Sequence, residues 1–452
     1  MASGSAMNAE TARAGWATVD CTPPLGLPMG GRGTRFTPGR EVLDPLCLQA
    51  LLLRDTVGKA LLLISVDMIG LSGDMTARFR RELSAHTGLP PSHIVFNFSH
   101  THSGPMSGFE GYATLREKPD TLVIYEETVL EAAIHAVREA LACEQPASVR
   151  WHRGTSDIGI NRRGRNAQGL MALLPNADGY YNPDLWVLDV AGVDGERCIA
   201  FSYGCHPVIV YGYAWDAISA DFPGACRRAL QDALGESVQT QFVQGLAGNV
   251  RPRLLANLTQ GRFEKGTPAS PLAVGQSLAE DVLAALASES QTLALDVRIA
   301  STWIVLERDQ QMWPQAHWRE LAERESEMER ELGQYWLRRY TEGPPPVRAV
   351  PWEVGLLQLA SHRRIAFFSG EALAEWLPLL RDWLSDRELI AWGYCQDGRC
   401  YMPTDAQLDE GGYEVVQSNA YNKSGPGPFV RGIDEKVRRA YLRLAEKLER
   451  GV

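Results

Sequence analysis

The first half of the chain alternates short apolar runs with longer amphipathic stretches. Apolar runs of strand length, bounded by turn residues, occur at 48–53, 60–66, 94–98, 185–190, 199–203 and 241–244. Stretches whose apolar residues recur every three or four positions predict helices at 75–86, 121–142, 225–234 and 272–287. The pattern predicts an α/β or mixed α+β body in which helices cover sheets.

The second half continues this pattern but contains one segment of different character. Strands are predicted at 354–359, 364–369 and 389–392, and helices at 372–384 and 435–449. Residues 315–340 are instead dense in Glu and Arg, which is typical of an exposed helix inserted into the body. The proline-rich stretch 341–347 ends this segment. We therefore expect one domain over residues 11–450 with a helical insertion at 315–340, and a disordered or tag-derived N-terminus at 1–10.

The composition is that of a globular protein rather than of a nucleic-acid or membrane binder. At 452 residues the chain exceeds the ~250–300 at which a single core usually stops growing, so a large domain with insertions fits. A net charge of −10 argues against nucleic acid and anionic membranes as partners. No apolar run reaches membrane-spanning length and no basic leader is present, so we expect a cytoplasmic protein. Eight cysteines without a Cys-x-x-Cys pair fit reduced thiols in that compartment.

Two histidines separated by one residue, His100 and His102, closely follow the strand predicted at 94–98. In an extended backbone, residues i and i+2 face the same side, so both imidazoles would enter one site. Imidazole is the commonest side-chain metal ligand near neutral pH. Taken alone, the pair is more simply explained as two polar residues that open a turn, so the other polar motifs decide its meaning.

Other polar side chains also stand near the ends of apolar runs. His206 follows the strand 199–203, and Glu371 follows a glycine after the strand 364–369. Loops at strand ends are where catalytic groups concentrate on α/β scaffolds. Each motif has an ordinary alternative; Glu371, for example, stands where a helix dipole favours a carboxylate in the first turn. Further polar motifs contain Asp20, Arg162, Asn249, Arg251, Tyr401 and Tyr413.

Taken together and in this order, these motifs resemble the neutral/alkaline ceramidase family, zinc-dependent amidases that hydrolyse N-acyl sphingosine. The resemblance spans about Gly15 to Glu414, nearly the whole chain. It implies the ceramidase-like catalytic fold and a zinc ion held by two histidines, a glutamate and a tyrosine. By motif, these ligands correspond to His100, His206, Glu371 and Tyr401.

The resemblance also implies roles for residues around that zinc. His102 and Tyr413 would act on the oxyanion or leaving group, and oxyanion donors are often worth ~3–4 kcal/mol each. Asp20 would orient a histidine and fix its tautomer. Arg162 would bind substrate or hold the carboxylates of the site. Zinc with nitrogen and oxygen ligands lowers the pKa of bound water to roughly 7 and polarises a carbonyl, so the expected reaction is hydrolysis of an amide or ester bond.

The chain departs from the family within one motif of the site and at its C-terminus. The family carries a serine where this chain has Arg251, in the motif Gly248-Asn249-Val250-Arg251-Pro252. The planar fork of arginine suits a carboxylate or phosphate, so Arg251, with Asn249 and Arg162, is expected to bind substrate. We also expect a short form without the β-sandwich domain that follows in the family. The predicted substrate is therefore small and polar or anionic rather than ceramide.

Three other functions are compatible with the sequence. The first is a lipid amidase acting on N-acyl sphingoids or fatty amides, which requires a long apolar cleft. The second uses the same metal for lyase, isomerase or glycosidase chemistry. The third is a non-catalytic ligand-binding relative that retained the fold. The expected partner is a small molecule, and the oligomeric state, including a homo-oligomer, is left open.

Overall fold

The fold is built around a large mixed sheet. The computed structural model describes residues 12–31, 33, 36–309, 313–343, 348–398 and 400–451, so the predicted segment 1–10 lies outside the described residues. In the described part, this sheet has the order β12-β10-β9-β6-β1-β3-β4-β5, and β16 pairs with β6. The strands are β12 (Gln239–Gln244), β10 (Arg197–Tyr203), β9 (Asp184–Gly192), β6 (Gln145–Thr155), β1 (Arg13–Asp20), β3 (Cys47–Arg54), β4 (Ala60–Val66), β5 (Ile94–Phe98) and β16 (Gln291–Thr292).

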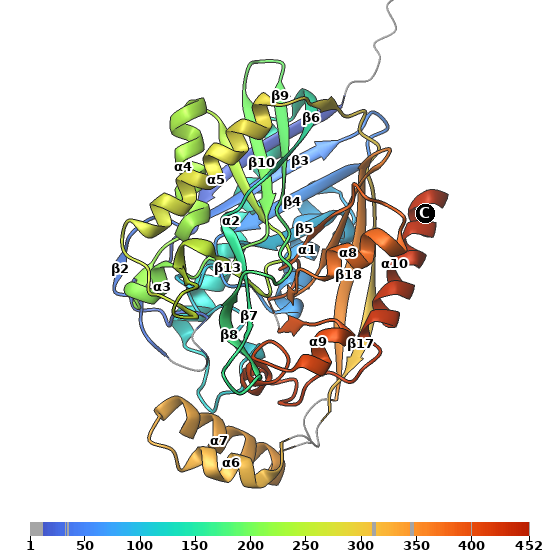
Figure 1. The fold of residues 1–452 in the computed structure, drawn as a ribbon. Helices are drawn as coiled ribbons and strands as arrows, with labels where there is room; N and C mark the ends of the chain where they lie inside the picture. Colours follow the sequence, from blue (N-terminus) through green and yellow to red (C-terminus); the bar gives the residue numbers. More distant parts are fainter. Residues whose placement is uncertain are drawn as a thin grey trace, which may run out of the picture.

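A second sheet packs against the first, and helices cover the outer faces of both (Figure 1). Its order is β17-β18-β19-β21, with β17 (Arg298–Glu307), β18 (Ala349–Ala360), β19 (Arg363–Phe368) and β21 (Ile390–Trp392). The first sheet is covered by α1 (Gly73–Thr87), α2 (Asp120–Ala142), α4 (Asp221–Leu234) and α5 (Ser270–Ala287). The second is covered by α8 (Trp376–Trp383) and α10 (Ile433–Arg450). The result is a helix–sheet–sheet–helix arrangement, which confirms the predicted α/β (mixed α+β) class.

Alternation along β3 shows how the sequence produces these layers. Leu48, Ala50 and Leu52 belong to the apolar cluster that includes α1 and α2, whereas Leu51 and Leu53 belong to the cluster between the two sheets. Successive residues of a strand face opposite sides, so both faces of β3 are buried and most of its residues are apolar. Full burial of one leucine side chain stabilises the fold by roughly 1.5–3 kcal/mol. The buried leucines of β3 therefore contribute strongly to the stability of the core.

Segments with strong periodicity form the predicted elements, whereas three strands with polar residues among their apolar ones were missed. The bounds of β3, β4, β5, α2, α5 and α10 agree with the predicted ranges to within a few residues. The sequence analysis did not predict β1, β6 or β17. On β6 the exposed Ser148 and Arg150 alternate with the buried Ala147, Val149 and Trp151. The alternation is present, but its charged positions make the run look like a loop.

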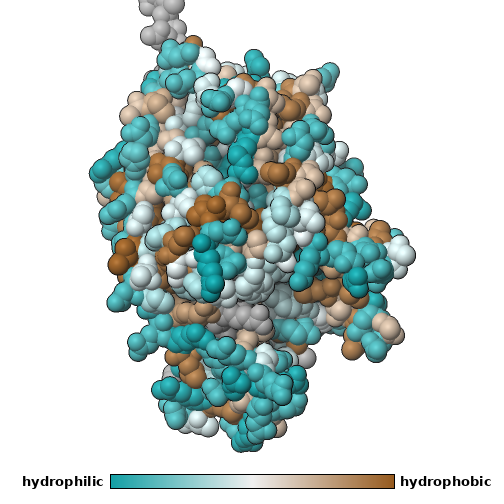
Figure 2. Space-filling model, turned by 90° about the vertical axis from the view of Figure 1, so that its left-hand side faces the viewer, coloured by the Kyte–Doolittle hydropathy of each residue, from teal (hydrophilic) through white to brown (hydrophobic). Residues whose placement is uncertain are grey.

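The charged segment at 315–340 was predicted to be a single exposed helix. It forms a hairpin of two helices instead. It consists of α6 (Gln315–Ala322) and α7 (Glu327–Thr341), which are set apart at one end of the molecule (Figure 1). The hydroxyl of Ser326 accepts a hydrogen bond from the N–H of Glu329, so it caps α7 and starts a new helix. The outer surface of the hairpin is largely hydrophilic, as predicted (Figure 2).

The remaining α-helices and β-strands are short. They are α3 (Val210–Tyr213), α9 (Asp405–Glu410), β2 (Glu41–Val42), β7 (Gly159–Arg165), β8 (Met171–Asn176), β11 (Ala217–Ile218), β13 (Val250–Pro252), β14 (Ala256–Asn257), β15 (Arg262–Phe263), β20 (Glu371–Ala372) and β22 (Tyr401–Met402). The helix predicted at 372–384 begins later, at Trp376, because residues 371–372 pair with β22. Among the described helices, none combines the length and apolar character that crossing a membrane requires.

Candidate functional site

His100 lies just beyond the end of β5, where the backbone leaves the extended conformation. Its φ is +65°, in the left-handed region, and its N–H donates to the carbonyl of Met68 at 3.0 Å. The argument from strand alternation is therefore wrong, because His100 and His102 do not share an extended segment. Their rings nevertheless lie together, with centroids 5.1 Å apart. A left-handed non-glycine residue is strained, and such strain is concentrated at functional sites.

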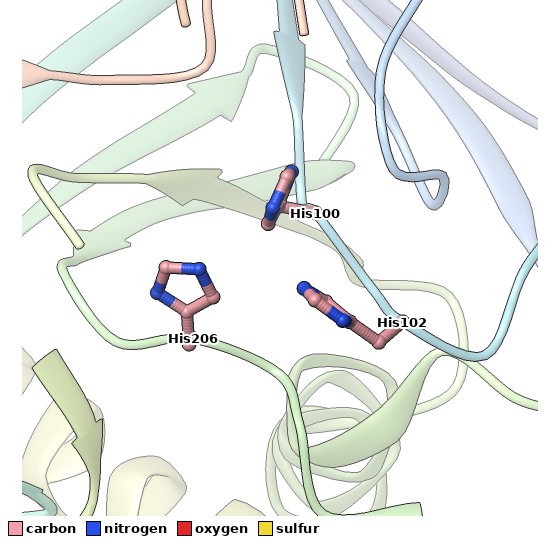
Figure 3. Close-up of side chains that lie close together, drawn as sticks. All are labelled: His100, His102 and His206. Atoms are coloured by element: carbon pink, nitrogen blue, oxygen red, sulfur yellow. The ribbon is translucent and has the colours of Figure 1, made fainter. Parts of the chain in front are cut away.

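His206 joins these two histidines from the loop after β10. The N–H of His102 donates to the carbonyl of Pro207 at 3.2 Å, which ties the two histidine loops together. In the described part of the chain, one ring nitrogen from each of the three histidines lies within 4.8 Å of the others (Figure 3). Imidazoles at this spacing could hold a metal ion.

The backbone determines which nitrogen of each ring carries the proton. Nδ1 of His100, His102 and His206 lies 2.6, 3.0 and 2.5 Å from the carbonyl oxygens of Ile69, Gly31 and Ala247, respectively. A carbonyl oxygen only accepts, so Nδ1 donates in each ring and Nε2 of the neutral ring keeps its lone pair. Backbone carbonyls in this role orient an imidazole for metal binding through Nε2.

Glu371 supplies a carboxylate oxygen between two of these rings. Its Oε2 lies 3.3 Å from Nε2 of His100 and 3.2 Å from Nε2 of His206. Burial, together with the nearby Arg162, lowers the pKa of His206 to about 3, so this ring is neutral at pH 7. A neutral Nε2 lone pair facing a carboxylate oxygen is unfavourable unless a cation lies between them. The donor set therefore fits a metal cation.

Tyr401 and Glu371 are brought together by a two-residue parallel pairing. They are direct partners in the register of β20 and β22. The Nη2 of Arg162 donates to the Tyr401 hydroxyl at 2.9 Å. Burial raises the pKa of this phenol well above its usual value, while the guanidinium of Arg162 acts in the opposite direction. The tyrosine thus lies beside one cation and next to the carboxylate that contacts two histidines.

Arg162 is held by a buried network rather than by solvent. Its Nε donates to Oε1 of Glu414 at 2.8 Å, and Nη1 of Arg163 donates to Oε2 of the same carboxylate at 2.9 Å. Arg163 is 3% exposed, so it has a structural role in the core. The ring of Tyr413 lies 5.8 Å from that of Tyr401 and 5.9 Å from the guanidinium of Arg162. Two distant parts of the chain, at 162–163 and 401–414, therefore form one wall of the site.

The solvent-accessible side of these site residues borders a cavity of about 640 Å³. Its inner lining includes His100, His102, Glu371, Tyr401 and Tyr413. Cavities of this size, with a few convergent polar groups, are typical of small-molecule sites, which range over roughly 300–1,000 Å³. The arrangement can therefore bind a small molecule with its polar centre against the histidines.

Solved structures with a similar arrangement of the chain exist. Neutral ceramidase from Pseudomonas aeruginosa superimposes with a TM-score of 0.72 and 15% sequence identity, covering 98% of this chain and 75% of that one. This chain has a neutral-ceramidase-like fold. A ceramidase complexed with C2 gives a TM-score of 0.72 at 13% identity, covering 98% of this chain and 76% of that one. No protein-family model matches the sequence, and no curated protein matches it significantly.

Within this ceramidase-like fold, two predicted residues lie in structural rather than functional positions. Asp20 is exposed at the end of β1, where Oδ1 accepts the N–H of Thr22 at 2.7 Å. The expectation that it orients a histidine is wrong, because backbone carbonyls occupy all three Nδ1 positions. Asn249 is fully buried: its amide donates to the carboxylate of Glu375 at 2.8 Å, and its oxygen accepts from Ala374 at 2.9 Å. Its side chain holds the loop and is not available to a substrate.

Arg251 lies on β13 opposite Ile160 of β7, the strand that also contains Arg162. Its guanidinium stacks on the ring of Phe263 at 4.6 Å, and its Nε is enclosed without a hydrogen-bond partner. Burial lowers the pKa of Arg251, and no acidic side chain among the described residues forms an ion pair with it. It is not among the described residues that line the cavity. A substrate contact through Arg251 therefore stays a prediction.

Two residues that hold the histidines in place were not predicted from the sequence. The side-chain amide of Gln244 donates to the carbonyls of Ser99 and Cys205, both at 2.9 Å, and so joins the two histidine loops. The fully buried ring of Tyr394 lies 4.4 Å from that of His100. Both residues are at or just after the end of a predicted strand, so the rule that identified His206 could have found them.

Proposed function

We propose that this protein is a metal-dependent hydrolase that cleaves an amide or ester bond in a small molecule, with zinc as the metal. The observation that carries the proposal is the convergence of Nε2 of His100, Nε2 of His206 and Oε2 of Glu371. The neutral-ceramidase-like fold supports a hydrolase, since it is shared with enzymes named as ceramidases.

His100, His206, Glu371 and Tyr401 would hold the ion. Two imidazoles, a carboxylate and a phenol oxygen form a donor set of nitrogen and oxygen that suits zinc. When bound, the ion supplies Lewis acidity that activates a water and polarises the carbonyl of the substrate. Arg162 contributes by donating to the Tyr401 hydroxyl, which favours the phenolate form as a ligand.

His102 and Tyr413 are proposed to act on the substrate. Both line the cavity next to the ligand group, and the His102 ring is oriented by its contact with the Gly31 carbonyl. Burial raises the pKa of the Tyr413 phenol, so the hydroxyl keeps its proton and can donate it in a hydrogen bond. A donor aimed at a developing oxyanion is worth about 3–4 kcal/mol in a typical hydrolase.

A small polar or anionic substrate is part of this proposal. The cavity volume of about 640 Å³ suits such a molecule, and Arg251, whose guanidinium stacks on Phe263, adds a positive charge on β13. We expect Arg251→Ser to raise KM for an anionic substrate. Unchanged kinetics would remove Arg251 from the proposal. A cytoplasmic location is retained as a further part of it, to be tested by fractionation of the source cells.

Ceramide hydrolysis is the second candidate, because both similar structures are ceramidases. A fluorescent ceramide and a set of short N-acyl amides and esters distinguish the two substrate classes directly. Turnover of ceramide that exceeds turnover of every short substrate would favour the lipid amidase.

The hydrolase itself is tested by metal content and by the fate of solvent oxygen. We expect about one zinc per chain by elemental analysis and loss of activity after chelation, with recovery on adding zinc. His100→Ala and His206→Ala should lose both zinc and activity. Hydrolysis in ¹⁸O-water should place one labelled oxygen in the acid product, whereas lyase or isomerase chemistry would not label it. Absence of stoichiometric zinc, or full activity in both variants, would overturn the proposal.

A further inference from the structure

The α6–α7 hairpin is fixed against two segments that border the cavity. Trp318 and Trp336 of the hairpin pack with Ala113 and Ala420 in one buried apolar cluster. The indole N–H of Trp336 donates to the carbonyl of Ala420 at 2.8 Å. The cavity lining includes the neighbouring Tyr112 and Tyr421. The hairpin is therefore a positioned part of the cavity wall, although Figure 1 shows it at one end of the molecule.

Met328 joins the hairpin to the loop that orients His102. A Cβ on Gly33, where φ is +63°, would lie 3.0 Å from the sulfur of Met328. A Cβ on Gly31 would lie 2.4 Å from Nδ1 of His102, whose partner is the Gly31 carbonyl. Only glycine leaves room for these close approaches. The hairpin thus packs on the same short loop that holds a residue proposed to act on the substrate.

Arg339 is the hairpin's cation on the cavity wall. Its Nε is enclosed without a hydrogen-bond partner, and in the described part of the chain no acidic side chain forms an ion pair with it. The adjacent Arg338 is different, since it is exposed and its Nε lies 3.1 Å from Oε2 of Glu342. A partly enclosed guanidinium that forms no ion pair within the described part of the chain is well stabilised by an anion from outside.

We propose that the α6–α7 hairpin selects the substrate, and that Arg339 binds a carboxylate at the end of the substrate remote from the scissile bond. The inference rests on the proposed hydrolase function, because the same cavity is lined by His100, His102 and Arg339. The guanidinium fork matches a carboxylate through two parallel hydrogen bonds. The substrate class is then an amide or ester whose acyl or leaving part ends in a carboxylate.

Paired ester probes test this assignment. The probes are 4-nitrophenyl monoesters of succinate, adipate and suberate, each compared with the neutral ester of a monoacid of similar length. We expect the wild-type protein to prefer one of the anionic esters, with a chain length that spans the cavity. Arg339→Gln should lower kcat/KM for that ester at least tenfold, mainly through KM, and should leave the neutral ester unchanged. Arg339→Lys should restore part of the loss.

Arg338→Gln is the matched control, since it removes a neighbouring cation that is paired outside the cavity. It should leave both kinds of ester unaffected. Equal kinetics of Arg339→Gln and wild type, or an equal loss with anionic and neutral esters, would overturn the role of Arg339. Loss of hydrolysis by the zinc-free protein tests the proposed function separately.

Binding without turnover provides a second measurement. Adipate should raise the Tm of the wild-type protein and of Arg338→Gln, but raise that of Arg339→Gln less. Equal Tm shifts in all three proteins would contradict carboxylate binding by Arg339 even if no ester is hydrolysed. Circular dichroism of each variant establishes that it is folded.

Discussion

Glu371 and Tyr401 are direct partners in the parallel pairing of β20 with β22, although thirty positions of sequence separate them. This pairing brings a carboxylate and a phenol to the same place as His100 and His206. Backbone hydrogen bonding rather than side-chain attraction thus sets the spacing of the two proposed oxygen ligands. A short sheet of this kind gives a metal site a rigid base.

The first prediction concerns the carboxylate of this pair. Glu371→Gln should lower zinc affinity more than about 100-fold, since even partners behind the ligands are often worth 10–100-fold. Competition with a chromophoric chelator measures the affinity. Glu410→Gln is the control, because Glu410 pairs with Arg163 away from the histidines. Wild-type zinc affinity in Glu371→Gln would remove Glu371 from the ligand set.

The second prediction concerns Arg162. Its replacement by Gln leaves the buried Glu414 with only one cation and removes the donor to Tyr401. Breaking a buried ion pair costs about 3–5 kcal/mol, so urea unfolding should show a loss of that order. Zinc affinity should also fall. Arg165→Gln, at the exposed end of β7, should change stability by less than about 0.5 kcal/mol. A destabilised variant with full zinc affinity would make Arg162 purely structural.

The third prediction concerns the pH dependence of the metal-free protein. Burial lowers the pKa of His206 from its usual value of 6.5 to about 3. Below pH 6.5 the unfolded chain therefore binds a proton that the folded chain does not, and stability falls as the pH falls. One pKa unit corresponds to about 1.4 kcal/mol, so the loss between pH 6.5 and 5 is about 2 kcal/mol for this group. Urea titrations at several pH values should show a smaller slope for His206→Gln. An identical slope would contradict a neutral buried His206.

The fourth prediction concerns the glutamine that joins the histidine loops. Gln244→Met keeps the side-chain volume but removes the hydrogen bonds to Ser99 and Cys205. Each unsatisfied buried group costs about 1–3 kcal/mol, and the two loops should separate enough to weaken zinc binding. Gln241→Met is the matched control, because Gln241 is on the same strand but bonds to Ser65. Both variants should be less stable, and only Gln244→Met should lose zinc. Equal zinc affinity in the two would leave Gln244 with a role in stability alone.

Sequence patterns predicted the elements whose periodicity is uninterrupted. The apolar strands β3 and β4 and the amphipathic helix α2 are recognised because their buried positions repeat at the period of the element. β7 was missed because Arg162 and Arg163 resemble a solvated loop, yet both are buried against one carboxylate. These charged side chains can be buried in the strand because an oppositely charged partner is buried with them. That partner, Glu414, belongs to a distant part of the chain.

The sequence indicated which residues to consider for the candidate site, but it did not indicate how they are arranged. His100, His206, Glu371 and Tyr401 were chosen by motif, and the structure brings them together. The reason offered for the histidine pair was wrong, because His100 has left-handed backbone. Asp20 and Asn249 were wrongly given functional roles, since their polar atoms are used by neighbouring backbone and side chains. Local sequence does not reveal which hydrogen-bond partners a polar side chain will find.

The sequence by itself determined the apolar strands, the long helices and the set of donor residues available for a metal. These properties depend on residue type and local periodicity, so they can be read along the chain. Only the tertiary structure decided that backbone carbonyls orient the three histidines, that Gln244 joins their loops, and that the charged hairpin brings Arg339 to the cavity. Each of these depends on contacts between segments far apart in sequence, and such contacts are set by how the layers pack.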